Sequence, residues 1–598
     1  MSPDLLPPVA PAVTAELVEA LSPRLRKRLD AGIAKLAARP VVREGDTVRI
    51  AVDDDTDLEL HAPGGTVTDA DAIRCGCLLA PDCLHRAAAA SAAPVADDTA
   101  DASPAPSQSS QNSQKETAEG EESSQPSAVE TAAPDRLAAA RAVFEAAAAV
   151  LAAGTDGSGA VLQAELLRAA HSARLAGLPR AAASAVSVVT GVRAARSADP
   201  AYRLPDLVDA LRSVLGVAHR LPFATGRDLA ELRGSVRQPY TPDGSLRLYG
   251  LFSEPILTAS GYAGAVTWTA DTEGRLYTVS DVAPGGPGRA TGAADRAVRI
   301  GDASLTHREL SRAGLAVSGA TVSPTGRLGA GAGVRAVRAV GAAWSEAPLD
   351  RLWTVPAAEQ VARALSGGPG DGHGLLFLDV TLAGTVREAT GDCLLADCDG
   401  LALRLAMAHD DPALPYRDNL RLLAAARGKR LRIVARLAPG PVPRALLLAA
   451  EHPAGADARV DLGLDRLQRA DLPAAAASPA SAPPVDEAPL HLLGRRVQQT
   501  VSGGRRVLSF PGGGAGDGGR LRRVGLATAA DLLDELQAAA ADRSRDAFGR
   551  LLPADADRFA RAWLASAVYT AEVERALCAA AWGASGQGVT TSPEGVRI

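Results

Sequence analysis

The sequence contains few aromatic residues, few lysines and few cysteines, and each shortage restricts what the protein can be. Aromatic side chains account for 3% of the 598 residues, so hydrophobic cores must consist of Leu, Val and Ala, mostly in helices. The lysines are Lys27, Lys35, Lys115 and Lys429, and this general preference for arginine makes any single arginine a weak sign of phosphate binding. The net charge of −6 excludes a general polyanion binder, so a nucleic-acid site would have to be a local basic patch.

Long apolar segments are also missing. No run of eighteen or more apolar residues occurs, and residues 1–17 lack the basic and apolar regions of a signal peptide. We therefore expect no membrane partner and a soluble, cytoplasmic protein. Thiols stay reduced in that compartment, so clustered cysteines favour a metal site over disulfides.

The chain is a series of segments that differ in composition, and its length predicts roughly three to five domains. A helix over 22–38, strands over 47–52 and 57–62 and a helix over 84–93 predict a small ββα domain at the start. The polar stretch that follows cannot offset chain entropy by burial, which predicts disorder. The sequence thus predicts a multidomain α+β protein with a cysteine-containing domain (1–92), a disordered linker (93–134), a helical domain (135–234), a β-rich domain (235–372), an α+β domain (373–472), a second linker (473–489), and a basic loop with a helical C-terminal domain (490–598).

The central region carries the pattern of strands. Residues 245–284 are β-branched, aromatic and glycine-rich, which favours antiparallel hairpins, and a short helix is predicted over 303–315. Within 375–452 the predicted order is three strands, a helix and two strands. That is the order of an OB-fold barrel, whose face often binds oligonucleotides or oligosaccharides, although many other α+β domains share it.

Three of the six cysteines and one of the nine histidines lie within "CGCLLAPDCLH", residues 75–85. Cys75-x-Cys77 and Cys83-x-His85 supply three thiolates and one imidazole, the ligands of a closed, tetrahedral Cys3His structural zinc site. Pro81 and Asp82 suit the start of the helix that carries Cys83 and His85. The alternative is a set of buried free cysteines beside a surface histidine.

A Cys-x-Cys…Cys-x-His pattern that follows a β-hairpin and enters a helix resembles the SWIM zinc finger. The resemblance covers about 45 residues and includes uncharacterised SWIM-finger proteins of actinobacteria. It implies that Cys75, Cys77, Cys83 and His85 bind one structural Zn²⁺, and that the finger binds DNA or protein.

Two basic stretches are candidates for nucleic-acid contact. The first predicted helix carries Arg24, Arg26, Lys27 and Arg28. The second stretch has glycine flanks that would let its arginines follow a phosphate backbone, although a solvated arginine-biased loop explains it equally well. Its members are Arg495, Arg496, Arg505, Arg506, Arg520, Arg522 and Arg523.

The remaining motifs carry little chemistry. "GAGDGG" (514–519) satisfies G-x-G-x-x-G but is followed by "RLRRVG", which we interpret as a flexible loop, so no nucleotide cofactor is expected. Cys393 and Cys398 are interpreted as strand thiols and Cys578 as a core residue. With neither a P-loop nor a catalytic motif, the sequence predicts no enzyme.

The leading hypothesis is a zinc protein that binds nucleic acid, DNA more than RNA. The alternative is a protein-interaction scaffold in which the zinc is purely structural.

Overall fold

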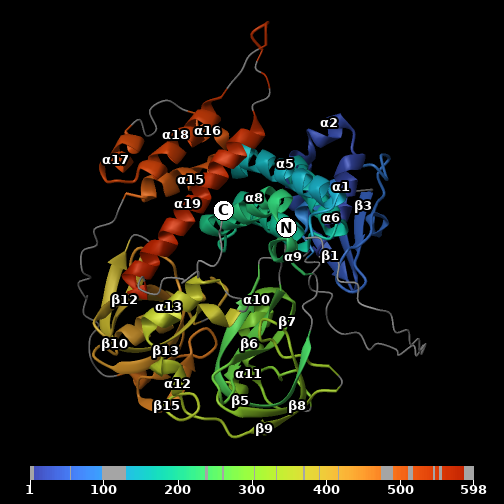
Figure 1. Ribbon diagram of the computed structural model, residues 1–598. Coiled ribbons are helices and arrows are strands. Elements are labelled where there is room, and N and C mark those ends of the chain that lie inside the picture. The colour runs from blue at the N-terminus through green and yellow to red at the C-terminus, as the bar shows by residue number, and fades with distance from the viewer. Residues whose placement is uncertain are drawn as a thin grey trace, which may run out of the picture. The chain divides into compact units, whose positions relative to one another are not determined.

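The computed structural model is a mixed α+β protein, as the sequence predicts (Figure 1). Its chain forms two compact units: unit 1 comprises Met1–Arg237 and Pro489–Val568, and unit 2 comprises Gln238–Ala488 and Tyr569–Ile598. The structure describes residues 6–53, 56–96, 130–235, 240–258, 262–301, 303–331, 333–367, 371–388, 391–414, 416–472, 489–509, 516–542, 546–550, 552 and 555–584. Most of both predicted linkers (97–129 and 473–488) therefore lies outside the described residues.

The first part of unit 1, residues 6–96, is called the finger segment below. Its strands form an antiparallel sheet in the order β1-β2-β3-β4. Successive side chains of a strand point to opposite faces of the sheet, which places Val48, Ile50, Leu58 and Leu60 in the core. The two predicted strands are β2 and β3, and the sequence analysis missed the short β1 and β4. The elements are α1 (Pro11–Ala20), α2 (Pro23–Arg26), α3 (Leu29–Ala37), β1 (Val41–Glu44), β2 (Thr47–Asp53), β3 (Thr56–His61), β4 (Ile73–Cys75) and α4 (Leu84–Ala92).

The helix predicted over 22–38 is wrong as a single element. The Ser22 hydroxyl accepts a hydrogen bond from the Leu25 N–H and begins α2 as predicted, but the chain turns after Arg26 and starts again as α3. This turn brings Leu29, at the start of α3, fully into the core of the finger segment. The helix is interrupted between Arg26 and Leu29 because the interruption allows Leu29 to be buried. Helix periodicity alone does not reveal this.

Alanine-rich helices form the rest of unit 1. Their small side chains let helices approach closely around Val143, Leu151, Leu215, Phe559 and Trp563. They are α5 (Pro134–Gly157), α6 (Ala160–Leu175), α7 (Pro179–Arg196), α8 (Leu204–Arg220), α9 (Gly226–Arg233), α15 (His491–Gly503), α16 (Arg505–Leu508), α17 (Asp517–Arg523), α18 (Ala527–Ala541) and α19 (Ala556–Ala581), the last of which passes into unit 2.

One helix among the described residues, α5, is long and apolar enough to cross a membrane by length and composition. Half of its most apolar window is buried, and its Val143, Phe144 and Leu151 belong to the core of unit 1. These contacts are those of a core helix.

The segments of unit 1 are packed on one another, although the sequence divided them into separate domains. Asp30 of α3 pairs with Arg196 of α7 at 3.1 Å, and Arg193 donates to the Ala93 carbonyl at 2.6 Å. Gly154 of α5, at a φ of +70°, meets Gly504 so closely that a Cβ on Gly154 would lie 2.3 Å from the Gly504 nitrogen. Only glycine fits this contact between segments 350 positions apart.

Unit 2 begins with an antiparallel sheet in the order β7-β6-β5-β8-β9. The predicted helix over 303–315 is shorter than expected: Thr306 and Glu309 form a capping box, and the chain leaves the helix after Leu310 to enter β8. The elements are β5 (Thr241–Leu257), β6 (Tyr262–Ala270), β7 (Leu276–Pro284), α10 (Gly286–Thr291), α11 (His307–Leu310), β8 (Gly314–Val322), β9 (Arg335–Ala339), α12 (Arg351–Thr354) and α13 (Ala357–Leu365).

The second sheet of unit 2 is a closed barrel with the OB-fold order. Its strand order is β12-β11-β10-β13-β14-β15, and a parallel pairing of β12 with β14 closes it. Strand β10 bends between Leu382 and Gly384, so that its first half pairs with β13 and its second half with β11. The elements are β10 (Leu375–Glu388), β11 (Gly391–Cys398), β12 (Leu401–Met407), α14 (Asn419–Ala424), β13 (Arg430–Leu437), β14 (Arg444–His452) and β15 (Gly455–Asp461).

The two sheets repeat one topology, although the sequence shows no repeat. Across each sheet, the first five strands of the chain are arranged in the order third, second, first, fourth and fifth, with a helical segment between the third and fourth in sequence. The second sheet has a sixth strand, β15, at its end. The long first strand also changes partner midway in both, β5 passing from β8 to β6 near Tyr249. Trp268, Trp344, Trp353 and Phe377 pack together where the two sheets meet, so the scarce aromatic residues concentrate at this junction.

Candidate metal centre

The four predicted ligands come from two adjoining pieces of backbone in the finger segment. Cys75 ends β4, and the Gly76 N–H donates to the Asp57 carbonyl at 3.1 Å, which fixes the turn toward Cys77. Cys83 is the N-cap residue of α4, and His85 lies in the first turn of that helix. The strand end and the helix start are thus brought face to face.

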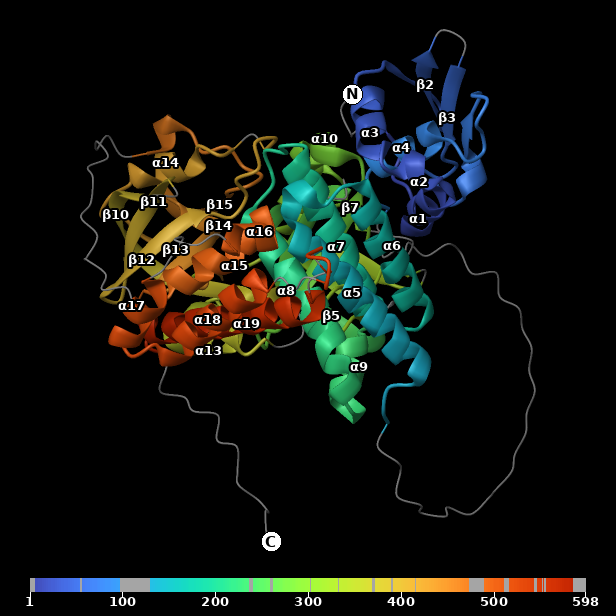
Figure 2. The same cartoon turned by 90° about the horizontal axis from the view of Figure 1, so that it is seen from above.

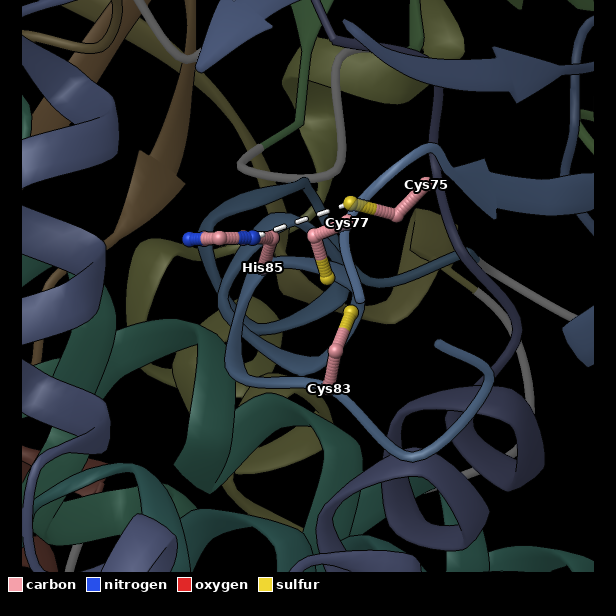
Figure 3. A group of neighbouring side chains, drawn as sticks. All are labelled: Cys75, Cys77, Cys83 and His85. Carbon is pink, nitrogen blue, oxygen red and sulfur yellow. Dashed lines mark hydrogen bonds between the residues drawn. The ribbon is translucent and has the colours of Figure 1, made fainter. Parts of the chain in front are cut away.

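The side chains of Cys75, Cys77, Cys83 and His85 converge on one point (Figure 3). Their ligand atoms all lie within 4.8 Å of one another, and Cys75 Sγ is 3.6 Å from His85 Nδ1. A tetrahedral site with metal–sulfur bonds of about 2.3 Å separates its ligand atoms by roughly 3.8 Å, so the cluster can hold one metal ion. No second cluster of this kind occurs in the described part of the chain.

The three thiols differ in their readiness to ionise. Burial raises the pKa of Cys75 to about 12, and burial also raises the pKa of Cys83. Burial opposes ionisation of Cys77 as well, but the backbone N–H groups of Leu79 and Ala80 and the neighbouring thiols bring its pKa below the ordinary value. A metal ion must therefore displace protons from Cys75 and Cys83, so binding will release protons and weaken at low pH.

Arg86 connects the two halves of the candidate site, and the sequence analysis missed it. The whole residue is 5% exposed, and its guanidinium donates hydrogen bonds to the carbonyls of Ile73, Pro81 and Ala70. Ile73 lies two residues before Cys75, and Pro81 lies between Cys77 and Cys83, so one side chain joins both halves of the ligand set. The available signal was a single charged residue on the buried face of an alanine-rich helix, immediately after His85.

We expect Arg86→Gln to weaken metal binding about tenfold to a hundredfold, as loss of groups that orient metal ligands typically does. The shorter amide cannot reach all three carbonyls, so the two halves of the site must be ordered by the metal itself. Competition with a chromophoric chelator measures the affinity, and Arg74→Gln, an exposed arginine of β4, is the matched control. If Arg86→Gln bound the metal as tightly as the wild type, Arg86 would not position the metal ligands.

Among the predicted basic residues of the first stretch, Arg24, Lys27 and Arg28 are exposed. Arg26 is instead partly buried and donates to the carbonyls of Leu21 and Glu19. Lys35 and Arg39 add two exposed cations at the far end of α3.

Helix α3, which directly follows Lys27 and Arg28, packs against α4 beside the metal centre. A Cβ on Gly32 would lie 3.1 Å from Leu84 Cγ, so the glycine lets α3 approach the residue between Cys83 and His85. Figure 2 shows α3 beside α4 in the finger segment. The only acid of α3, Asp30, is paired with Arg196, which leaves the exposed side of α2 and α3 cationic.

The basic loop predicted over 495–523 is wrong in its structure. The described residues form α15, α16 and α17, while 510–515 lie outside the described part. Arg505 is buried: its guanidinium donates to the carbonyls of Ala539, Ala540 and Asp542 and lies over the Phe559 ring. It ties α16 to the end of α18 and is not accessible to a phosphate.

The other six arginines of that stretch are divided between pairing and exposure. Arg496 pairs with Asp517 at 3.1 Å, and Arg522 pairs with both Asp531 and Asp534 at 2.7 Å. Carboxylates therefore neutralise part of the predicted basic surface. The exposed members are Arg495, Arg506, Arg520, Arg522 and Arg523, and of these Arg522 is paired as described and Arg520 lies 4.0 Å from Asp517.

The remaining cysteines are placed as the sequence analysis interpreted them. Cys393 and Cys398 are buried on β11, and burial raises the pKa of both, that of Cys398 to about 11. Cys578 is fully buried in the core of unit 2.

The second and third strands of the closed barrel, β11 and β12, contain no aromatic residue, and β11 exposes Asp392 and Asp397. This surface lacks the stacking and cationic groups of an oligonucleotide-binding face.

Comparison of the chain with protein-family models, curated proteins and solved structures gave no match.

Proposed function

We propose that the metal of the Cys3His cluster is one structural Zn²⁺ and that the finger segment is a SWIM-like zinc finger. The observation that carries this proposal is the convergence of all four ligand atoms within 4.8 Å. Three thiolates and an imidazole are a ligand set that zinc prefers, and four protein ligands leave no coordination position for a catalytic water. The proposal accordingly includes no catalytic activity and no nucleotide cofactor.

We further propose that the protein binds nucleic acid, DNA more than RNA, through the finger segment, and that it works in the cytoplasm. Support comes from the cationic side of α2 and α3, which adjoins the metal centre at Gly32 and Leu84. Zinc would hold α4 in place, and α4 would support α3. The exposed Arg24, Lys27 and Arg28 could then contact successive phosphates, whose released counterions favour binding.

The triple variant Arg24→Ser/Lys27→Ser/Arg28→Ser is expected to bind DNA at least tenfold more weakly. Each lost phosphate contact lowers the slope of log K against log salt by about 0.9, so the slope should fall by about 2 to 3. Fluorescence anisotropy with labelled single- and double-stranded DNA and RNA at several salt concentrations measures both quantities. Arg506→Ser/Arg520→Ser/Arg523→Ser, which removes three exposed arginines of the other stretch, is the matched control.

The alternative function is a protein-interaction scaffold in which the metal only stabilises the finger segment. Absence of binding at low salt by the full-length, zinc-loaded protein would contradict nucleic-acid binding and leave this alternative. Equal loss of affinity in both triple variants would place the nucleic-acid site on both basic stretches.

A further inference from the structure

The loop between the second and third metal ligands presents apolar side chains to solvent. Leu78 is fully exposed and Leu79 is 63% exposed, and Ala80 and Pro81 beside them are also exposed. We call residues 78–81 the finger tip. Single exposed leucines are common on protein surfaces, but four consecutive apolar residues without cover are characteristic of contact sites.

The finger tip is held in place from both ends. Cys77 and Cys83, the ligands on either side, anchor it to the metal centre. The Ala80 N–H donates to the Cys77 carbonyl at 3.1 Å, and Arg86 Nη1 donates to the Pro81 carbonyl at 2.6 Å. Because the loop is already ordered, burying its leucines against a partner would cost little additional conformational entropy. Such rigid apolar anchors commonly dominate the affinity of protein interfaces.

The charges around the finger tip are mainly negative. Asp82 follows it directly, Asp57 lies where Gly76 bonds to the backbone of β3, and Asp71 lies 3.8 Å from the Arg86 guanidinium that holds Pro81. All three aspartates are exposed, and Arg74, next to Cys75, is an exposed cation. A phosphate backbone or an anionic lipid surface would be repelled here, whereas a cationic protein surface would be attracted.

The composition of the chain also bears on what could cover the finger tip. Residues 97–129, which follow the finger segment, contain several acids, one lysine (Lys115) and almost no large apolar side chains. That stretch offers neither the positive charge nor the apolar side chains that would complement the finger tip, so its composition does not suit it to cover the finger tip.

We propose that the finger tip is a docking site for a protein partner that offers an apolar pocket with a cationic rim. Leu78 and Leu79 fill the pocket, and Asp57, Asp71 and Asp82 face the rim. This docking site is distinct from the proposed nucleic-acid site, because it consists of other residues of the finger segment. Docking of a protein partner there does not depend on the contacts made by α2 and α3.

The test uses the full-length, zinc-loaded protein and a displayed library of random peptides as the probe. Enriched peptides should combine bulky apolar residues with Lys or Arg. For synthetic versions of these peptides, Leu78→Ser/Leu79→Ser should raise Kd at least tenfold while zinc content stays at one per chain. Leu175→Ser, an exposed leucine at the end of α6, should leave Kd unchanged, and Asp82→Lys should weaken binding most at low salt.

Three outcomes would overturn the proposal. The first is that no peptide is enriched, and the second is that enriched peptides bind the double-leucine variant as well as the wild type. The third is that Leu78→Ser/Leu79→Ser lowers affinity for DNA instead, which would make the leucines part of the nucleic-acid site. None of these outcomes depends on whether the Arg24, Lys27 and Arg28 variant alters DNA binding, so failure of one proposal is distinguishable from failure of the other.

Discussion

Cys83→Ser is expected to reduce the zinc content from about one ion per chain to none and to unfold the finger segment around the metal centre. Cys83 is 2% exposed and begins α4, so its loss removes both a ligand and the anchor of the helix that carries His85. Structural zinc in finger peptides contributes about 10–16 kcal/mol of binding free energy, which is also folding free energy. Metal analysis measures the stoichiometry, and hydrogen exchange of residues 73–92 measures the local unfolding.

Cys393→Ser is the matched control, because Cys393 is also a buried free thiol but lies on β11 in the other unit. This variant should keep one zinc ion and normal protection of residues 73–92. Retention of a full zinc ion by Cys83→Ser would show that the assigned ligand set is wrong. Cys77→Ser should behave like Cys83→Ser, because a site with three remaining ligands is open to solvent and to competing chelators.

The metal centre was predictable from sequence because its ligands are local: all four lie within eleven residues, and their spacing alone indicates the geometry. Arg86 was not predictable in the same way, because its partners at Ala70, Ile73 and Pro81 are backbone carbonyls, which leave no mark in the sequence. The contact of Gly32 with Leu84 is similarly invisible until the chain is folded.

The closed barrel was predictable in element order, since β10 to β14 alternate clearly with turns and a short helix. The closing pairing of β12 with β14 and the repeated topology of the two sheets were not predictable, because pairing between distant strands depends on tertiary packing.

Glycines in 495–523 indicated a loop, yet burial of Leu508 and Leu521 and the carbonyl contacts of Arg505 favour helices there. Tertiary contacts outweighed the weak local preference of glycine for turns.

Unit 2 is expected to lose about 3 kcal/mol of stability between pH 6.5 and pH 4 because of His307. This histidine is fully buried, and Thr267 Oγ1 lies 2.7 Å from its Nδ1. Burial lowers its pKa from 6.5 to about 4, against a smaller opposing effect of Asp281. The unfolded chain therefore binds a proton at a pH where the folded chain does not, so stability is complete above pH 6.5 and falls as the pH drops toward 4.

Glu254 extends the same loss to lower pH. It is 3% exposed and accepts hydrogen bonds from Trp268 Nε1 at 2.8 Å and from Arg436 at 2.9 Å, with His409 Nε2 at 3.2 Å. Burial opposes its ionisation, but His409, Arg436 and Trp268 together lower its pKa from 4.5 to about 2. A depressed carboxyl pKa contributes stability that is present above pH 4.5 and lost as the pH falls from 4.5 toward 2, below the range of His307.

Urea unfolding followed by tryptophan fluorescence at a series of pH values separates the two groups. Four of the five tryptophans, Trp268, Trp344, Trp353 and Trp582, lie in unit 2, so the signal reports mainly on that unit. His307→Asn should be less stable at pH 7 but should lose the dependence between pH 6.5 and 4, because asparagine does not titrate. His373→Asn, which changes a half-buried histidine of the same unit, should keep the wild-type profile. If His307→Asn retained the full loss of stability between pH 6.5 and 4, another group would have to take up the proton on unfolding, since Glu254 acts only below pH 4.5.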